Sequence, residues 1–87
     1  MNWQTIREHF PHSWMLLEAI DATTEKGYRI IHNFSVLEQF GDSFDNAWAQ
    51  YKLVHKRDPY REFYVIHTDR EELDIQVMDA FWRVVNE

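Results

Sequence analysis

One stretch near the middle of the chain, residues 28–37, alternates between two sets of side chains. An alternation with a period of two predicts a β-strand, because successive side chains along a strand point to opposite faces of a sheet. A strand is stable only when neighbouring strands satisfy its backbone hydrogen bonds, so the rest of the chain must supply them. The two expected faces are Tyr28, Ile30, His32, Phe34 and Val36, and Arg29, Ile31, Asn33, Ser35 and Leu37.

Two further segments predict strands that can join this one. Residues 13–20 form a short, strongly apolar run, which favours a strand covered on both faces. Residues 61–67 follow Pro59 and are rich in aromatic and β-branched side chains. We expect residues 21–27 to form a polar connection that ends at Gly27.

A central amphipathic helix is predicted after Gly41, with Asp42 or Ser43 as its N-cap. Its apolar stripe should pack across one face of an antiparallel sheet, because helices and sheets bury their apolar sides against each other. The stripe consists of Phe44, Ala47, Trp48, Tyr51, Val54 and His55.

The two ends of the chain predict short helices. Asn2 can cap a first helix with apolar positions at Trp3, Ile6 and Phe10, and Pro11 ends it. For residues 69–86 two interpretations compete: a fourth strand near 72–77 followed by a helix near 79–86, or one long helix with a capping box at residues 68–71. We favour the strand and the helix. The predicted fold is therefore one α+β domain over residues 1–87, with an antiparallel sheet of three or four strands.

Composition narrows the classes of function. The 87 residues carry a net charge of −6, which disfavours a general nucleic-acid binder. The chain has no cysteine and therefore neither disulfides nor thiolate metal ligands. It contains no apolar run long enough to span a bilayer, so we expect a cytoplasmic protein without a membrane partner. A lone Gly41 before a helix is too little for a phosphate-binding loop, and we expect no cofactor.

Several segments resemble a group of small bacterial proteins without an assigned function. The resemblance covers residues 14–75 and implies a compact bacterial cytoplasmic domain. It transfers no catalytic or binding residue to this chain. The segments that carry it are SWMLLEA at 13–19, KGYRI at 26–30, AWAQY at 47–51 and PYREFYVIHT at 59–68.

A small metal-dependent or acid-base enzyme is the first alternative function. His32, His67 and Asp69 would form a two-histidine, one-carboxylate set if their strands were neighbours. His32 is equally explained as a hydrogen-bonded imidazole in the core. Glu18 interrupts an apolar run and could act as a buried acid, point to solvent at a strand end, or pair with Arg29 on an adjacent strand.

A phosphate or RNA binder is the second alternative. Residues 52–61 hold four basic side chains against one acid, with Tyr60 as a ring on which a base could stack. The same basic segment could instead pair with the acidic segment that begins at Asp69, in the same molecule or in a second one. The four basic residues are Lys52, Lys56, Arg57 and Arg61.

Aromatic content favours a third function, which is our leading prediction. Fourteen Trp, Tyr and Phe side chains are more than one small core can easily enclose. We therefore expect a non-enzymatic protein-interaction or self-associating module, most simply a homodimer. The candidate contact residues are Trp3, Phe10, Leu53, Tyr60, Phe81 and Trp82.

Overall fold

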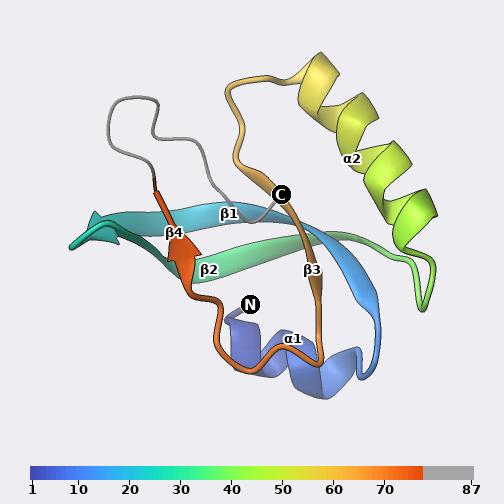
Figure 1. Cartoon of the computed structure of the whole chain (residues 1–87), viewed down its shortest axis with the longest axis horizontal. Coiled ribbons are helices and arrows are strands. Elements are labelled where there is room, and N and C mark those ends of the chain that lie inside the picture. Colours follow the sequence, from blue (N-terminus) through green and yellow to red (C-terminus); the bar gives the residue numbers. More distant parts are fainter. Residues whose placement is uncertain (78–87) are drawn as a thin grey trace.

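The computed structural model describes residues 1–77 and confirms an α+β fold (Figure 1). Four strands form one antiparallel sheet in the order β3-β1-β2-β4, and two helices accompany it. The elements in chain order are α1 (Trp3–His9), β1 (Trp14–Glu25), β2 (Tyr28–Gln39), α2 (Phe44–Arg57), β3 (Phe63–His67) and β4 (Ile75–Gln76).

The first two strands form a longer hairpin than the sequence predicts. Residues 21–25 continue β1 instead of forming a connection, with Thr24 opposite Arg29. The turn consists of Lys26 and Gly27, whose φ angles of 51° and 82° are both positive, as in the tight turns that match strand twist. The polar side chains of residues 21–25 are compatible with a strand here because this end of the hairpin is largely exposed to solvent.

A register shift in the β1–β2 hairpin changes which side chains of β2 face the core. Ala19 lies opposite Phe34 and Ala22 lies opposite Ile31, and the pairing shifts twice between them. Phe34 and Ile31 consequently both pack in the core, although they are three residues apart. The prediction that Tyr28, Ile30, His32, Phe34 and Val36 share one face is therefore wrong in the first half of the strand, where Ile30 is 39% exposed. An inserted residue in a bulge changes the pairing without disturbing the alternation of the sequence.

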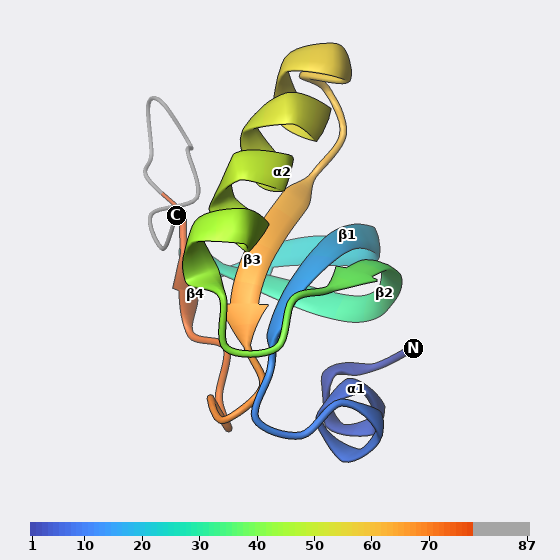
Figure 2. The ribbon, with the colours of Figure 1, turned by 90° about the vertical axis from the view of Figure 1, so that its right-hand side faces the viewer.

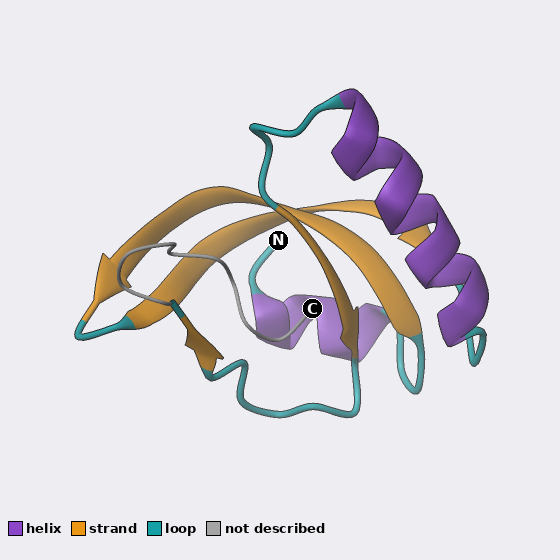
Figure 3. Ribbon diagram, turned by 45° about the horizontal axis from the view of Figure 1, so that its top comes forward, coloured by secondary structure: helices purple, strands orange, loops and turns teal. Residues whose placement is uncertain are grey.

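The two helices cover opposite faces of the sheet (Figures 2 and 3). Helix α1 contributes Trp3 and Ile6 to a core cluster with Leu17 of β1, whereas α2 places Tyr51 against Leu16. Neighbouring residues of β1 thus belong to different clusters, so the start of this strand is covered on both faces, whereas Ile20 is 60% exposed. The larger cluster comprises Trp3, Ile6, Met15, Leu17, Phe34, Tyr64, Ile66 and Ile75.

Both helices begin at the residues that the sequence predicts as caps. The side chain of Asn2 accepts a hydrogen bond from the Thr5 amide at 2.8 Å, and the Ser43 hydroxyl accepts one from the Asn46 amide at 3.3 Å. These oxygens satisfy amides that have no partner within the helix. Ala47 and Tyr51 of the predicted stripe of α2 are buried, whereas Phe44 is 42% exposed.

The segment after β3 excludes the long-helix interpretation of residues 69–86. Ile75 and Gln76 form a strand that pairs with the start of β2, as in the interpretation we favoured. Thr68 is not a helix cap: it is 2% exposed, accepts a hydrogen bond from the Ser13 amide and donates one to the Phe10 carbonyl. The predicted helix near 79–86 lies outside the described residues.

Candidate functional site at the edge of strand β3

Strand β3 forms one edge of the sheet, and its hydrogen-bonding pattern defines which backbone groups face outwards. The Ala19 amide donates to the Glu62 carbonyl and the Thr68 amide donates to the Ser13 carbonyl, both at 2.9 Å. Bonded pairs in an antiparallel ladder recur at every second residue. The backbone groups of Tyr64 and Ile66 therefore face β1, whereas those of Phe63 and Val65 face away from it. Within residues 1–77 these outward groups have no hydrogen-bond partner.

The opposite edge of the sheet is partly occupied. Strand β4 pairs with Tyr28 and Arg29 of β2. Further along β2, the Phe34 amide donates to the Met1 carbonyl at 2.7 Å, and the Met1 amino group donates to the Phe34 carbonyl at 2.8 Å. Both the amide and the carbonyl of Phe34 are therefore bonded, in contrast to those of Val65, which face away from β1 without a partner within residues 1–77.

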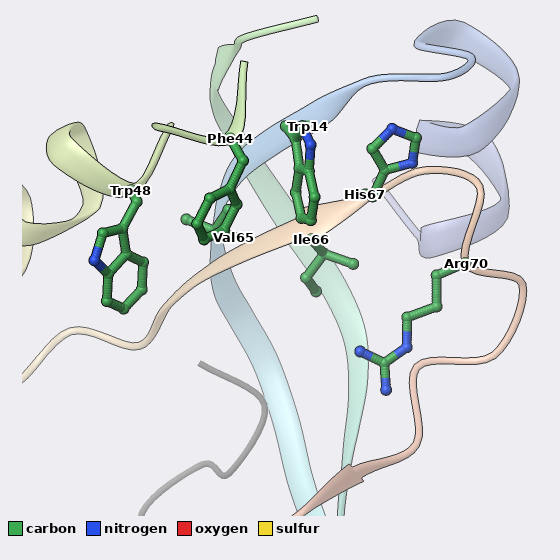
Figure 4. Close-up of a pocket in the computed structure, with 7 residues that line it drawn as sticks. All are labelled: Trp14, Phe44, Trp48, Val65, Ile66, His67 and Arg70. Atoms are coloured by element: carbon green, nitrogen blue, oxygen red, sulfur yellow. The ribbon is translucent and has the colours of Figure 1, made fainter. Parts of the chain in front are cut away.

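An apolar pocket of about 420 Å³ lies beside β3 (Figure 4). The Trp14 ring stands between Phe44 and His67, at centroid distances of 4.9 Å from each. Arg70 adds a guanidinium to the lining, and its Nε donates to the Glu72 carbonyl at 3.0 Å. A pocket of this kind can accept an apolar side chain from a segment that lies along β3. Its lining residues are Trp14, Phe44, Trp48, Val65, Ile66, His67 and Arg70.

The two ends of β3 continue into segments of opposite charge. Residues 52–61, which precede the strand, contain the four exposed basic side chains noted above and one acid, Asp58. Residues 69–74, which follow it, contain one basic side chain, Arg70, against four exposed acids. The four acids are Asp69, Glu71, Glu72 and Asp74.

Glu18 pairs with Arg61 and not with Arg29, which corrects one of the predicted partners. The Arg61 Nε donates to Glu18 Oε2 at 2.8 Å, and Asp58 accepts from the same guanidinium at 3.3 Å. The hydrogen bond from Arg61 lowers the pKa of Glu18. A lowered pKa is opposite to the raised value that a general acid needs, so the geometry disfavours a catalytic role for Glu18. Because Glu18 and Asp58 already bind its guanidinium, Arg61 is also less available to a phosphate than the basic segment 52–61 suggested in the sequence.

The predicted metal set is not brought together. Strand β1 separates β3, which carries His67, from β2, which carries His32, so the two strands are not neighbours. His32 is exposed, which also excludes its interpretation as a core imidazole. The His67 Nδ1 accepts a hydrogen bond from the Asp69 amide. In the part of the chain that the structure describes, no three His, Asp or Glu side chains are close enough to hold a metal ion.

The predicted contact residues occupy different environments. Trp3 lies in the core at 8% exposure, and its Nε1 donates to the Arg70 carbonyl at 2.9 Å. Phe10 packs at the border of the same core. Leu53 is 58% exposed and Tyr60 is fully exposed. Phe81 and Trp82 lie outside the described residues.

Sequence reasoning did not identify Phe63 and Val65 as edge residues. The sequence predicts a strand over residues 61–67, but it does not show whether that strand is central or at an edge. The pocket aromatics Trp14, Phe44 and Trp48 were predicted only as strand and helix residues.

Neither helix within residues 1–77 is long and apolar enough to cross a membrane. A comparison of the chain with protein-family models, curated proteins and solved structures finds no match.

Proposed function

We propose that this protein is a non-enzymatic protein-interaction module that self-associates through the outer edge of β3. The observation that carries the proposal is the outward backbone of Phe63 and Val65, which has no partner among residues 1–77 and lies beside an apolar pocket. An open sheet edge is a template for a further strand, and strand addition is a common mode of protein recognition.

The pocket supplies the specificity that backbone pairing lacks. Main-chain hydrogen bonds do not depend on the sequence of the added strand, whereas a pocket selects its side chains. Val65 and His67 line the pocket and also belong to the edge strand. An added strand would therefore run along the side of the pocket that β3 forms, while Trp14 of β1 and Phe44 of α2 line the pocket from the other elements.

Sedimentation velocity over a wide range of protein concentration tests the proposal. We expect the average mass to rise with concentration, and Val65→Pro to remain monomeric over the same range. Proline at this position removes an amide that faces away from β1, which edge strands tolerate. Ile66→Pro is the matched control, since it removes an amide that faces β1 and should unfold the domain. A wild-type protein that stays monomeric throughout would contradict the proposal.

A further inference from the structure

We propose that the strand added to β3 is the β3 strand of a second copy, antiparallel and centred on Val65. This inference rests on the proposed function and specifies the partner and its register. The outward-facing residues of β3 are Phe63, Val65 and His67, which are placed symmetrically about Val65. A two-fold axis at Val65 sets this residue opposite its own copy and sets Phe63 opposite His67 of the second copy. The same edge is thus complementary to itself, as a two-fold interface requires.

The charges that flank β3 favour the antiparallel arrangement. Beyond the strand, the register brings Arg61 of one copy towards Asp69 of the other, and the two-fold axis repeats this approach. Both residues lie in the turns that flank β3, where Arg61 also binds Glu18 and Asp69 also binds His12. More broadly, the basic end of β3 in each copy, which follows α2, approaches the acidic end that continues into residues 69–74 of the other. A parallel arrangement would set like charges side by side, which electrostatics disfavours.

The side chains near the pocket also fit this arrangement. Residues directly opposite in an antiparallel pair lie on the same face of the sheet. Phe63 of the second copy would therefore lie beside His67, whose ring contacts Trp14 edge-on. Tyr60, which is 100% exposed in the single chain, lies in the turn before β3, and the antiparallel arrangement brings this turn towards the one that precedes Arg70 in the second copy.

Disulfide trapping tests the register, because the natural chain contains no cysteine. Directly bonded antiparallel residues have Cα atoms about 5.5 Å apart, within the range of a disulfide. We expect Val65→Cys to form a covalent dimer on mild oxidation. Tyr60→Cys is the control: its side chain is more exposed, but the register places the two copies of residue 60 about 30 Å apart. Equal cross-linking of both variants would contradict the register.

Charge reversal tests the same register without a covalent bond. Arg61→Asp and Asp69→Arg should each weaken the homodimer about tenfold, because each sets like charges opposite one another twice. An equimolar mixture of the two variants should form a heterodimer, in which both contacts again join opposite charges. Urea unfolding of each variant checks that the domain remains folded, since Arg61 also binds Glu18.

The outcomes separate this inference from the proposed function. If the wild type dimerises but Val65→Cys forms no covalent dimer, the register is wrong while self-association stands. The same holds if a mixture of Arg61→Asp and Asp69→Arg dimerises no more tightly than either variant alone. A wild-type protein that remains monomeric would overturn both. A trapped Val65→Cys dimer together with recovery in the mixture would support the second copy as the partner.

Discussion

Arg29 and Glu62 form a two-pronged ion pair that joins the start of β2 to the residue before β3, across β1. The Arg29 Nε lies 2.9 Å from Glu62 Oε2, and Nη2 lies 2.8 Å from Oε1. The Tyr64 hydroxyl also donates a hydrogen bond to Glu62. Burial alone would raise the pKa of Glu62, but the hydrogen bonds from Arg29 and Tyr64 outweigh it and lower that pKa below its usual 4.5.

Glu62→Gln should lower the free energy of unfolding by about 1–2 kcal/mol near neutral pH, since it removes a partly buried charged partner of Arg29. A carboxyl with a lowered folded-state pKa stabilises the fold above its unfolded pKa of about 4.5 and loses this effect as the pH falls through the folded pKa. The difference between the wild type and Glu62→Gln should therefore shrink from about pH 5 towards pH 2. Urea unfolding at several pH values measures it. Glu71→Gln, an exposed acid, should change little, and a Glu62→Gln effect that is the same at all pH values would contradict the account.

Tyr64 should have a pKa above the usual value for tyrosine. Burial raises the pKa of its hydroxyl, and the hydrogen bond to Glu62 adds to the effect. A raised pKa means that the folded state disfavours the ionised ring, so its stabilising contribution persists below about pH 10 and declines above it. Absorbance titration of wild type and Tyr64→Phe isolates this residue. Loss of an ordinary tyrosine titration near pH 10 in the variant would contradict the prediction.

Thr68→Val should destabilise the domain by about 2–3 kcal/mol. The valine keeps the shape of threonine but leaves the Ser13 amide and the Phe10 carbonyl without the bonds that Thr68 makes at 2.9 and 2.7 Å. Thr68→Ser keeps the hydroxyl and should cost less than half as much. Thermal unfolding compares the two, and a loss of stability in Thr68→Ser as large as in Thr68→Val would contradict the dominant role of the hydroxyl.

Leu17→Ala should cost about 2–5 kcal/mol, because Leu17 is fully buried beneath α1 and its truncation leaves a cavity. Leu53→Ala, at a position 58% exposed on α2, should change stability by less than about 0.5 kcal/mol. Urea unfolding of both variants measures the contrast. A comparable loss in both would contradict the assignment of the core.

Features that depend on neighbouring residues in the sequence could be predicted, whereas contacts between distant segments could not. The cap Asn2 was identifiable because a cap bonds to an amide three residues away, and the second cap was narrowed to Asp42 or Ser43, of which the structure shows Ser43. The partner of Glu18 was not, because β1 has a neighbour on each side and the sequence does not say which one offers the arginine. The exposure of His32 depends on a register shift between two strands, and the open edge depends on the strand order.

Amide hydrogen exchange of Val65 as a function of protein concentration tests the central claim most directly. In the single chain this amide has no described partner, so at low concentration it should exchange quickly, and at high concentration it should become protected. The amides of Tyr64 and Ile66 face β1 and should be protected at every concentration, which provides an internal control. A Val65 exchange rate that does not change with concentration would contradict self-association through the edge of β3.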